Sequence, residues 1–281
     1  MTCVVSEMPY VRVNDVDIYY EDHGSGEPVV LLNGIFMNTK SWYLQLKPLV
    51  SRGYRVILHD MRGQWSSGKP DCADCYSLEI HADDLKQLLD KLNVKKAHII
   101  GTSYGGEVGM YFTIKYPDYV NDLTLITSVS EVHEELRTTA LRWLEGALSN
   151  DPKKFVLSWI NDVYSDSFIE KSGPQLLERL ISLYSSGFDF RSATYLLKAF
   201  LKLIEEPLTP KLRNISQPTL VIAAEKDRVK PPKYSEIIAK NITNSTYTIV
   251  NDAGHAVVIE KPAIINYLLI GFLYSHPLST T

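Results

Sequence analysis

A serine between glycines stands near the middle of the chain, where residues 101–105 read Gly-Thr-Ser-Tyr-Gly. The segment follows a short apolar run and opens a predicted helix, which is the context that gives the G-x-S-x-G pattern its meaning. A serine on such a sharp turn needs small residues two places away, because larger side chains would collide. The turn exposes the hydroxyl, and the positive end of the following helix favours an oxyanion. Ser103 is therefore a candidate nucleophile, and a plain glycine-rich turn is the alternative.

A serine hydroxyl is a poor nucleophile unless a base takes its proton. Among the seven histidines, His255 is the best candidate for that base, because it lies in a loop between the last predicted strand and the final predicted helix. His133, near the start of a long helical segment, is the alternative that could line the same pocket. The remaining histidines are interpreted as packing or solvent-facing residues: His23, His59, His81, His98 and His276.

The base needs an acid that fixes its tautomer and stabilises the imidazolium. Asp227 follows a predicted strand at 219–223, so the chain order is Ser103, Asp227, His255. Glu225 and Asp252 are the competing acids, and either one could be a surface carboxylate. We predict that Asp227 orients His255.

An oxyanion site needs two backbone donors. One is predicted to be the N–H of Tyr104, the residue after the nucleophile. The other is predicted in the segment Asn-Gly-Ile-Phe that follows the apolar run 28–32, where we choose Ile35. A simple turn at the end of a strand is the alternative interpretation of that segment.

These residues need elements that position them, and the chain alternates strand and helix patterns. Short apolar runs separated by helical patterns predict a mostly parallel sheet that is covered by helices on both faces, an α/β fold. The turn signal Asn-Asp at 14–15 predicts a hairpin at the start. The predicted strands are 10–13, 16–20, 28–32, 55–59, 97–100, 123–126, 219–223 and 247–250. The predicted helices are 42–51, 78–92, 106–115, 234–240 and 262–274.

Residues 131–206 have helical periodicity and no convincing strand. We therefore predict one core domain formed by residues 1–130 and 207–281, with 131–206 as an inserted helical cap. Such an insertion can cover the end of the sheet where open α/β folds bind ligands. It holds ten aromatic residues. Most of them are expected in its own core, and some are expected to make the pocket above the serine apolar.

Composition limits the other functions. The chain has 281 residues, of which 45% are hydrophobic and 22% charged, as in globular proteins. A net charge of −4 without a basic cluster argues against nucleic-acid binding. The first ten residues lack the apolar region of a secretory signal, and the apolar stretch 263–274 is too short to span a bilayer. A reduced, cytoplasmic protein is expected, since three cysteines do not make a disulfide framework.

A CxxC pair at Cys72 and Cys75 has no second pair to complete a zinc site, so it is interpreted as a loop pair that is either reduced or oxidised. Cys3 and His81 would be remote candidates for the missing ligands, so no metal is expected. No phosphate-binding loop is found, and no cofactor is required. The oligomeric state stays open.

The chain resembles the α/β-hydrolase superfamily, in its serine-nucleophile branch with a helical cap. That branch includes esterases, enol-lactonases, cofactor-free haloperoxidases and carbon–carbon hydrolases. The segments that carry the resemblance, in the family's order, are Leu-Leu-Asn-Gly-Ile at 31–35, Asp-Met-Arg-Gly at 60–63, Gly-Thr-Ser-Tyr-Gly-Gly at 101–106, Glu-Lys-Asp-Arg-Val at 225–229 and Ala-Gly-His-Ala at 253–256. Two positions depart from the family pattern: Asn33 replaces the usual histidine, and Trp65 follows Gln64 where the family often has His-Gly.

The resemblance implies acyl-enzyme chemistry, because relatives that open epoxides or remove halogens use aspartate where this chain has Ser103. We expect a serine hydrolase that cleaves a small or medium carboxylic ester or lactone, with a small-molecule acyl substrate. One alternative is a carbon–carbon bond hydrolase that uses the same three residues. The other is a hydrolase fold that serves as a non-catalytic small-molecule receptor.

Overall fold

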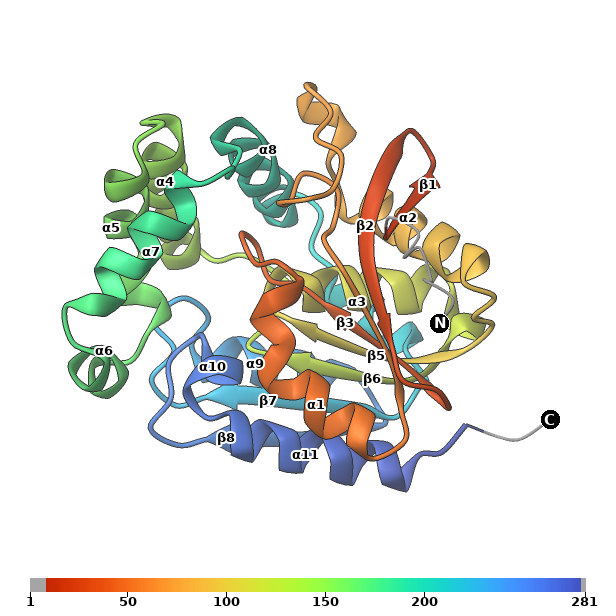
Figure 1. Cartoon of the computed structure of the whole chain (residues 1–281). Coiled ribbons are helices and arrows are strands. Elements are labelled where there is room, and N and C mark those ends of the chain that lie inside the picture. The colour runs from red at the N-terminus through yellow and green to blue at the C-terminus, as the bar shows by residue number, and fades with distance from the viewer. Residues whose placement is uncertain (1–8, 279–281) are drawn as a thin grey trace, which may run out of the picture.

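The computed structural model describes residues 9–278. Cys3, and most of the N-terminal segment in which no secretory signal was predicted, lie outside the described residues. The described chain forms one eight-stranded sheet in the order β1-β2-β4-β3-β5-β6-β7-β8 (Figure 1). β1 and β2 are antiparallel to their neighbours, and the strands from β4 to β8 are parallel.

The strands and helices lie close to the ranges that the sequence patterns predict. The strands are β1 (Tyr10–Val13), β2 (Val16–His23), β3 (Pro28–Leu32), β4 (Arg55–His59), β5 (Ala97–Thr102), β6 (Val120–Ile126), β7 (Thr219–Ala224) and β8 (Ser245–Val250). The helices of the sheet layers are α1 (Tyr43–Ser51), α2 (Leu78–Lys91), α3 (Tyr104–Lys115), α9 (Pro232–Asn241), α10 (Val257–Glu260) and α11 (Pro262–Ser275). The helices between β6 and β7 are α4 (Glu134–Leu148), α5 (Pro152–Val163), α6 (Asp166–Ser172), α7 (Gln175–Ser185) and α8 (Phe190–Leu201).

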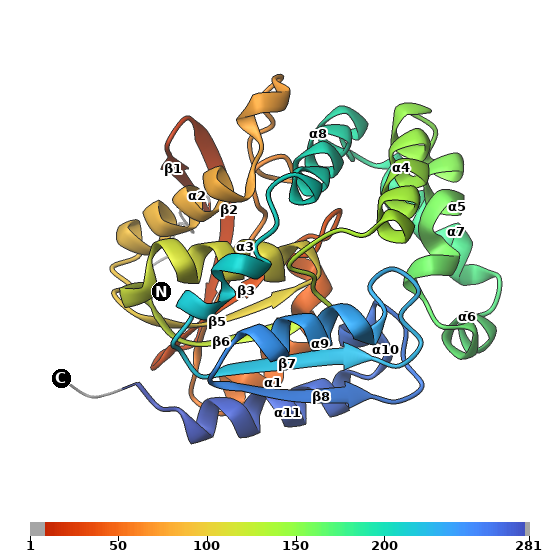
Figure 2. The same ribbon diagram turned by 180° about the vertical axis from the view of Figure 1, so that it is seen from behind.

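The central strand β3 shows why the sheet is covered on both faces. Successive side chains of a strand point to opposite faces. Val29 and Leu31 belong to the apolar cluster under α1 and α11, whereas Val30 and Leu32 belong to the cluster under α2, α3 and α9. All four side chains are fully buried. The apolar runs therefore form strands between two helical layers (Figures 1 and 2), which confirms the predicted α/β architecture.

The predicted hairpin is present, but its second strand is longer than the sequence pattern indicates. Asn14 adopts a positive φ of 47° in the turn between β1 and β2. β2 continues past residue 20 to His23, because its polar end pairs with β4 from Tyr20 opposite His59 to His23 opposite Val56. Backbone pairing here outweighs a polar sequence that carries no strand signal.

Between β6 and β7 the described chain forms helices only. α4 to α8 gather at the end of the sheet toward which β7 and its parallel neighbours point (Figure 2). An aromatic cluster holds this group together, since the rings of Phe155 and Phe188 stack at 5.2 Å and that of Tyr184 meets Phe188 edge-on at 4.8 Å. The division of the chain into a core and a cap stays a prediction.

The apolar stretch near the C-terminus forms α11, as predicted. Its residues Ile265, Leu269 and Leu273 are buried against the sheet. Within residues 9–278, no helix combines the length and the apolar character that a membrane crossing requires.

Candidate active site

Ser103 lies on the sharp turn that its glycine neighbours predict. It joins β5 to α3 with a φ of 52°, a backbone conformation that few residues other than glycine adopt. A Cβ atom at Gly105 would collide with the carbonyl oxygen of Leu32, and one at Gly101 would collide with that of Gly105. The turn therefore requires glycine, which has no Cβ atom, at both positions. It leaves the Ser103 side chain at the start of α3, where the helix end favours negative charge.

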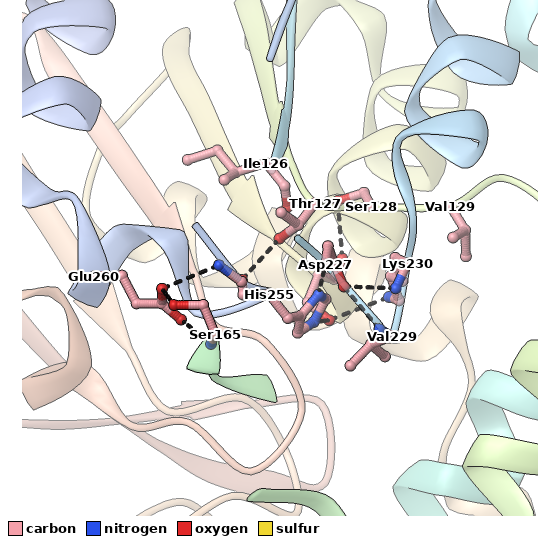
Figure 3. Close-up of polar contacts among 12 residues, drawn as sticks. Ile126, Thr127, Ser128, Val129, Ser165, Asp227, Val229, Lys230, His255 and Glu260 are labelled. Carbon is pink, nitrogen blue, oxygen red and sulfur yellow. Dashed lines mark hydrogen bonds and ion pairs between the residues drawn. The ribbon is translucent and has the colours of Figure 1, made fainter. Parts of the chain in front are cut away.

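The structure brings the three predicted side chains into one hydrogen-bonded row. The Oγ of Ser103 is 2.9 Å from the Nε2 of His255, and the Nδ1 of His255 is 2.7 Å from the Oδ2 of Asp227. The Oδ1 of Asp227 accepts hydrogen bonds from the backbone N–H groups of Val229, at 2.8 Å, and Lys230, at 2.7 Å. All members of the row are buried. The two backbone bonds hold the carboxylate of Asp227 in place beside His255 (Figure 3).

The competing acids lie elsewhere. The carboxylate of Glu225 accepts a hydrogen bond from the backbone N–H of Asp252. The carboxylate of Asp252 forms ion pairs with Lys226 and Lys261, which hold its pKa far below the usual range. Neither acid contacts the imidazole. The alternative base, His133, is half exposed and bonds to Glu131.

The loop that carries His255 is tied down by a residue that the sequence analysis did not single out. Glu260 accepts hydrogen bonds from the backbone N–H of Gly254, at 3.0 Å, and from both the N–H and the hydroxyl of Ser165. Thr127 adds a hydrogen bond from its hydroxyl to the carbonyl oxygen of His255. Glu260 therefore joins the His255 loop to the segment between α5 and α6 (Figure 3). An acid five residues after the histidine was the only signal available.

The segment that holds the predicted donor Ile35 packs directly on Ser103. A Cβ atom at Gly34 would lie 3.3 Å from the Cβ of Ser103. Ile35 and Tyr104 line the same small cavity beside the Ser103 side chain. The structure thus places both residues that are predicted to donate next to the serine.

The residues that depart from the family pattern form hydrogen bonds with the segment that contains Ile35. The side-chain amide of Gln64 donates to the carbonyl oxygen of Gly34 at 2.9 Å, and the indole N–H of Trp65 donates to that of Phe36 at 2.8 Å. Asn33 donates to the carbonyl oxygen of His59 and accepts from the indole N–H of a buried tryptophan. The unusual residues form a polar network that holds the backbone around Ile35.

Two cavities meet at Ser103. The larger has a volume of about 280 Å³ and reaches from the serine to His255 and the helices α5 and α7. Its walls are mainly aromatic and aliphatic, as is typical of small-molecule sites. Its aromatic lining residues include Trp65, Trp143, Trp159, Tyr164 and Tyr184. The smaller cavity, of about 20 Å³, has room for a group the size of one water molecule.

A buried ion pair adjoins the serine, and the sequence analysis missed it. Lys230 and Glu107 pair at 2.9 Å, and the Nζ of Lys230 is also 3.1 Å from the Oγ of Ser103. A carboxylate in the first turn of a helix is favourable by itself, but the Glu107 side chain is also fully buried and pairs with Lys230. Burial raises the pKa of Glu107, while the Lys230 ammonium and the N–H of Val129 act in the opposite direction.

The CxxC pair forms a disulfide between Cys72 and Cys75, the oxidised one of the two states predicted for this loop pair, although a reduced protein was the general expectation. Of the remote candidates for a zinc site, His81 is buried with its ring against Tyr104, and Cys3 lies outside the described residues. In residues 9–278, no three His, Cys, Asp or Glu side chains gather as metal ligands would.

Comparison with known proteins matches residues 27–262 to the family described as alpha/beta hydrolase fold. A putative carbamate hydrolase RutD of Azorhizobium caulinodans is 28% identical over 94% of this chain and 98% of its own. A 2-hydroxy-6-oxononadienedioate/2-hydroxy-6-oxononatrienedioate hydrolase of Paraburkholderia xenovorans is 29% identical over 95% of this chain and 96% of its own. Among solved structures, MGS-M2, an alpha/beta hydrolase enzyme from a Medee basin deep-sea metagenome library, is 27% identical with a TM-score of 0.88, covering 97% of this chain and 99% of that one.

Proposed function

The chain belongs to the α/β-hydrolase family, and from this premise we propose that it is a serine hydrolase of small or medium carboxylic esters or lactones, acting through an acyl-enzyme intermediate. The observation that carries the proposal is the hydrogen-bonded row from Ser103 through His255 to Asp227, with distances of 2.9 and 2.7 Å. In this proposal residues 131–206 act as the cap that encloses the substrate.

The first half-reaction forms the acyl-enzyme. Asp227 accepts the Nδ1–H of His255, which leaves Nε2 free to accept the proton of the Ser103 hydroxyl. The Ser103 oxygen bonds to the substrate carbonyl carbon, and the negative charge moves to the carbonyl oxygen. The backbone N–H groups of Ile35 and Tyr104 then donate to that oxyanion. The carbonyl re-forms as the bond to the leaving oxygen breaks, and this oxygen takes the proton from His255.

The second half-reaction releases the acid. A water molecule gives its proton to His255 and attacks the acyl carbon, and the tetrahedral intermediate collapses with return of the proton to the oxygen of Ser103. The larger cavity of about 280 Å³ supports a substrate of modest size with an apolar portion, since its walls are mainly aromatic and aliphatic.

Carbon–carbon bond hydrolysis is the second candidate, because the Paraburkholderia xenovorans relative is named for such a substrate class and is 29% identical over nearly the whole chain. The same three residues would serve, with a carbanion in place of the leaving oxygen. Turnover of a vinylogous diketone far above turnover of esters would favour this second candidate.

The test of the proposal is a panel of p-nitrophenyl esters and lactones with the wild type, Ser103→Ala and the exposed control Ser185→Ala. We expect Ser103→Ala to lose at least about a thousandfold in kcat, the scale of a missing nucleophile. The control should keep wild-type rates. Turnover by Ser103→Ala near the wild-type rate would refute the proposal, and slow single labelling of the wild type without product release would indicate a receptor.

A further inference from the structure

A charged side chain that the proposed mechanism does not use contacts its nucleophile. Lys230 lies three residues after Asp227, and its side chain is only 4% exposed. Its Nζ lies 3.1 Å from the Oγ of Ser103. A lysine ammonium is strongly hydrated, so its burial is costly unless specific partners replace the water. The groups that contact the Lys230 ammonium therefore indicate its function.

Glu107, in the first turn of α3, supplies the main replacement for water. Its two carboxylate oxygens lie 2.9 and 3.0 Å from the Nζ of Lys230, and one of them also accepts the backbone N–H of Val129. An ammonium group has three N–H donors. Two are taken by Glu107, and the third is directed at the oxygen of Ser103. The carboxylate thus places the Nζ of Lys230 where its remaining N–H can reach the nucleophile.

The position of Lys230 relative to the oxyanion donors is equally specific. Lys230 lines the small cavity of about 20 Å³ together with Ser103, Ile35 and Tyr104. Lys230 belongs to the loop that follows β7, where its backbone N–H donates to Asp227 at 2.7 Å (Figure 3). Lys230 therefore borders the same space as the two residues that are predicted to donate to the oxyanion.

We propose that Lys230 is a further catalytic residue, which donates a hydrogen bond to the attacking oxygen of Ser103 and stabilises its negative charge. This inference rests on the proposed function. As the proton of Ser103 passes to His255, the electron pair of the broken O–H bond forms the bond to the acyl carbon. Lys230 keeps all three of its protons throughout. A hydrogen bond between a cation and a developing anion is stronger than one to a neutral hydroxyl. Lys230 therefore favours the transition state over the ground state.

A purely structural role makes a different prediction. If Lys230 only neutralises the buried carboxylate of Glu107, removing both charges together should restore activity. If Lys230 acts on Ser103, that double change should restore stability alone. The variants are Lys230→Met, Glu107→Gln and their combination, because methionine keeps the length of the lysine stem and glutamine keeps the shape of the glutamate. Lys233→Met is the matched control, since Lys233 is an exposed lysine of the same region that pairs with Glu135.

The readouts are the rate of Ser103 labelling by a fluorophosphonate, kcat and KM for a p-nitrophenyl ester, and the melting temperature. For Lys230→Met we expect labelling and kcat to fall about 10- to 100-fold, a magnitude like that of a lost electrostatic donor, with KM changed less than about threefold. The double variant should melt within a few degrees of the wild type and stay at least about tenfold slower. Lys233→Met should match the wild type.

Three outcomes overturn the inference, and they separate it from the proposed function. A double variant that labels at the wild-type rate would show that Lys230 only balances Glu107. A Lys230→Met protein that labels like the wild type would refute the inference alone. A wild-type protein that neither labels nor turns over an ester would refute the proposed function, and the inference with it.

Discussion

Gln64 offers a sharp test of how the backbone around Ile35 is held. The side chain is 1% exposed and donates to the carbonyl oxygen of Gly34 at 2.9 Å. Its own oxygen accepts two longer bonds of 3.4 Å, from the side chain of Asn33 and from the backbone of Met61. Gln64→Met conserves volume and removes all three bonds.

The magnitude follows from these contacts. Without Gln64 the carbonyl oxygen of Gly34 keeps only its 3.2 Å bond from the N–H of Met37, so the loss of the Gln64 donor costs about 0.5–1.5 kcal/mol, and the two longer bonds add little. The unfolding entropy of a chain of 281 residues is about 0.6 kcal/mol/K, so the melting temperature should fall by about 1–3 °C. A looser Gly34 segment misplaces the N–H of Ile35. Since a complete loss of one oxyanion donor costs about 10²–10³ in kcat, we expect a partial loss of about 10- to 100-fold.

The assay is steady-state ester hydrolysis beside thermal melting, with Gln87→Met as the control. Gln87, on α2, bonds to Asn14 in the turn between β1 and β2, and neither residue lines the cavities at Ser103. We expect the control to keep kcat, and Gln64→Met to lose kcat with little change in KM, because the oxyanion forms only after substrate binds. A Gln64→Met protein that melts lower yet keeps wild-type kcat would refute the idea that this network positions the oxyanion donor.

Two further predictions concern stability. Burial lowers the pKa of His59 to about 4 and that of His81 to about 3, so both must stay neutral in the fold, and the stability they contribute above pH 6.5 is lost as the pH falls toward 4. Asp60, whose pKa is raised by burial to about 6, offsets part of that loss, as do His98 and Glu107, whose pKa values are also raised. The share of His81 alone is about 1.4 kcal/mol from pH 7.5 to 5.5, so urea unfolding of His81→Phe should lose that much less stability than the wild type over this range, and an equal loss in both proteins would contradict this. Gly105→Ala should lose about 3 kcal/mol of unfolding free energy, because a Cβ atom there meets backbone atoms. Gly271→Ala in α11 should gain about 0.5–1 kcal/mol of unfolding free energy, because a Cβ atom there meets open space. Similar melting temperatures for the two variants would refute the steric argument.

Much of the fold could be predicted because its signals are local. A strand buried on both faces is a short apolar run, as at 28–32, and the turn around Ser103 needs glycines at fixed spacing. The predicted ends of strands and helices were less accurate where contacts with another part of the chain determine the end. β2 continues to His23 because β4 binds its polar end, and α1 starts at Tyr43, after a 3₁₀ turn over Thr39–Trp42 that the predicted helix at 42–51 did not separate.

The missed parts of the site are pairings between distant residues. Lys230 and Glu107 are separated by 123 positions, and Glu260 and Ser165 by 95. Each residue alone has an ordinary explanation, as a loop lysine, a helix-terminus acid or a surface acid. Only the fold shows that the members of each pair are in contact. The departures at Asn33 and Trp65 likewise become intelligible as one hydrogen-bonded network, which no single position reveals.

The central claim is that Ser103 carries the acyl group, and the most direct measurement traps that intermediate. The wild type is mixed with p-nitrophenyl acetate, quenched in acid within the burst, and digested with trypsin, which releases the peptide 97–115 that contains Ser103. Fragmentation should locate the acetyl group on Ser103, and the same peptide from Ser103→Ala should be unmodified. Ester turnover with the acetyl group on another residue, or with an unmodified Ser103 under saturating substrate, would contradict the account.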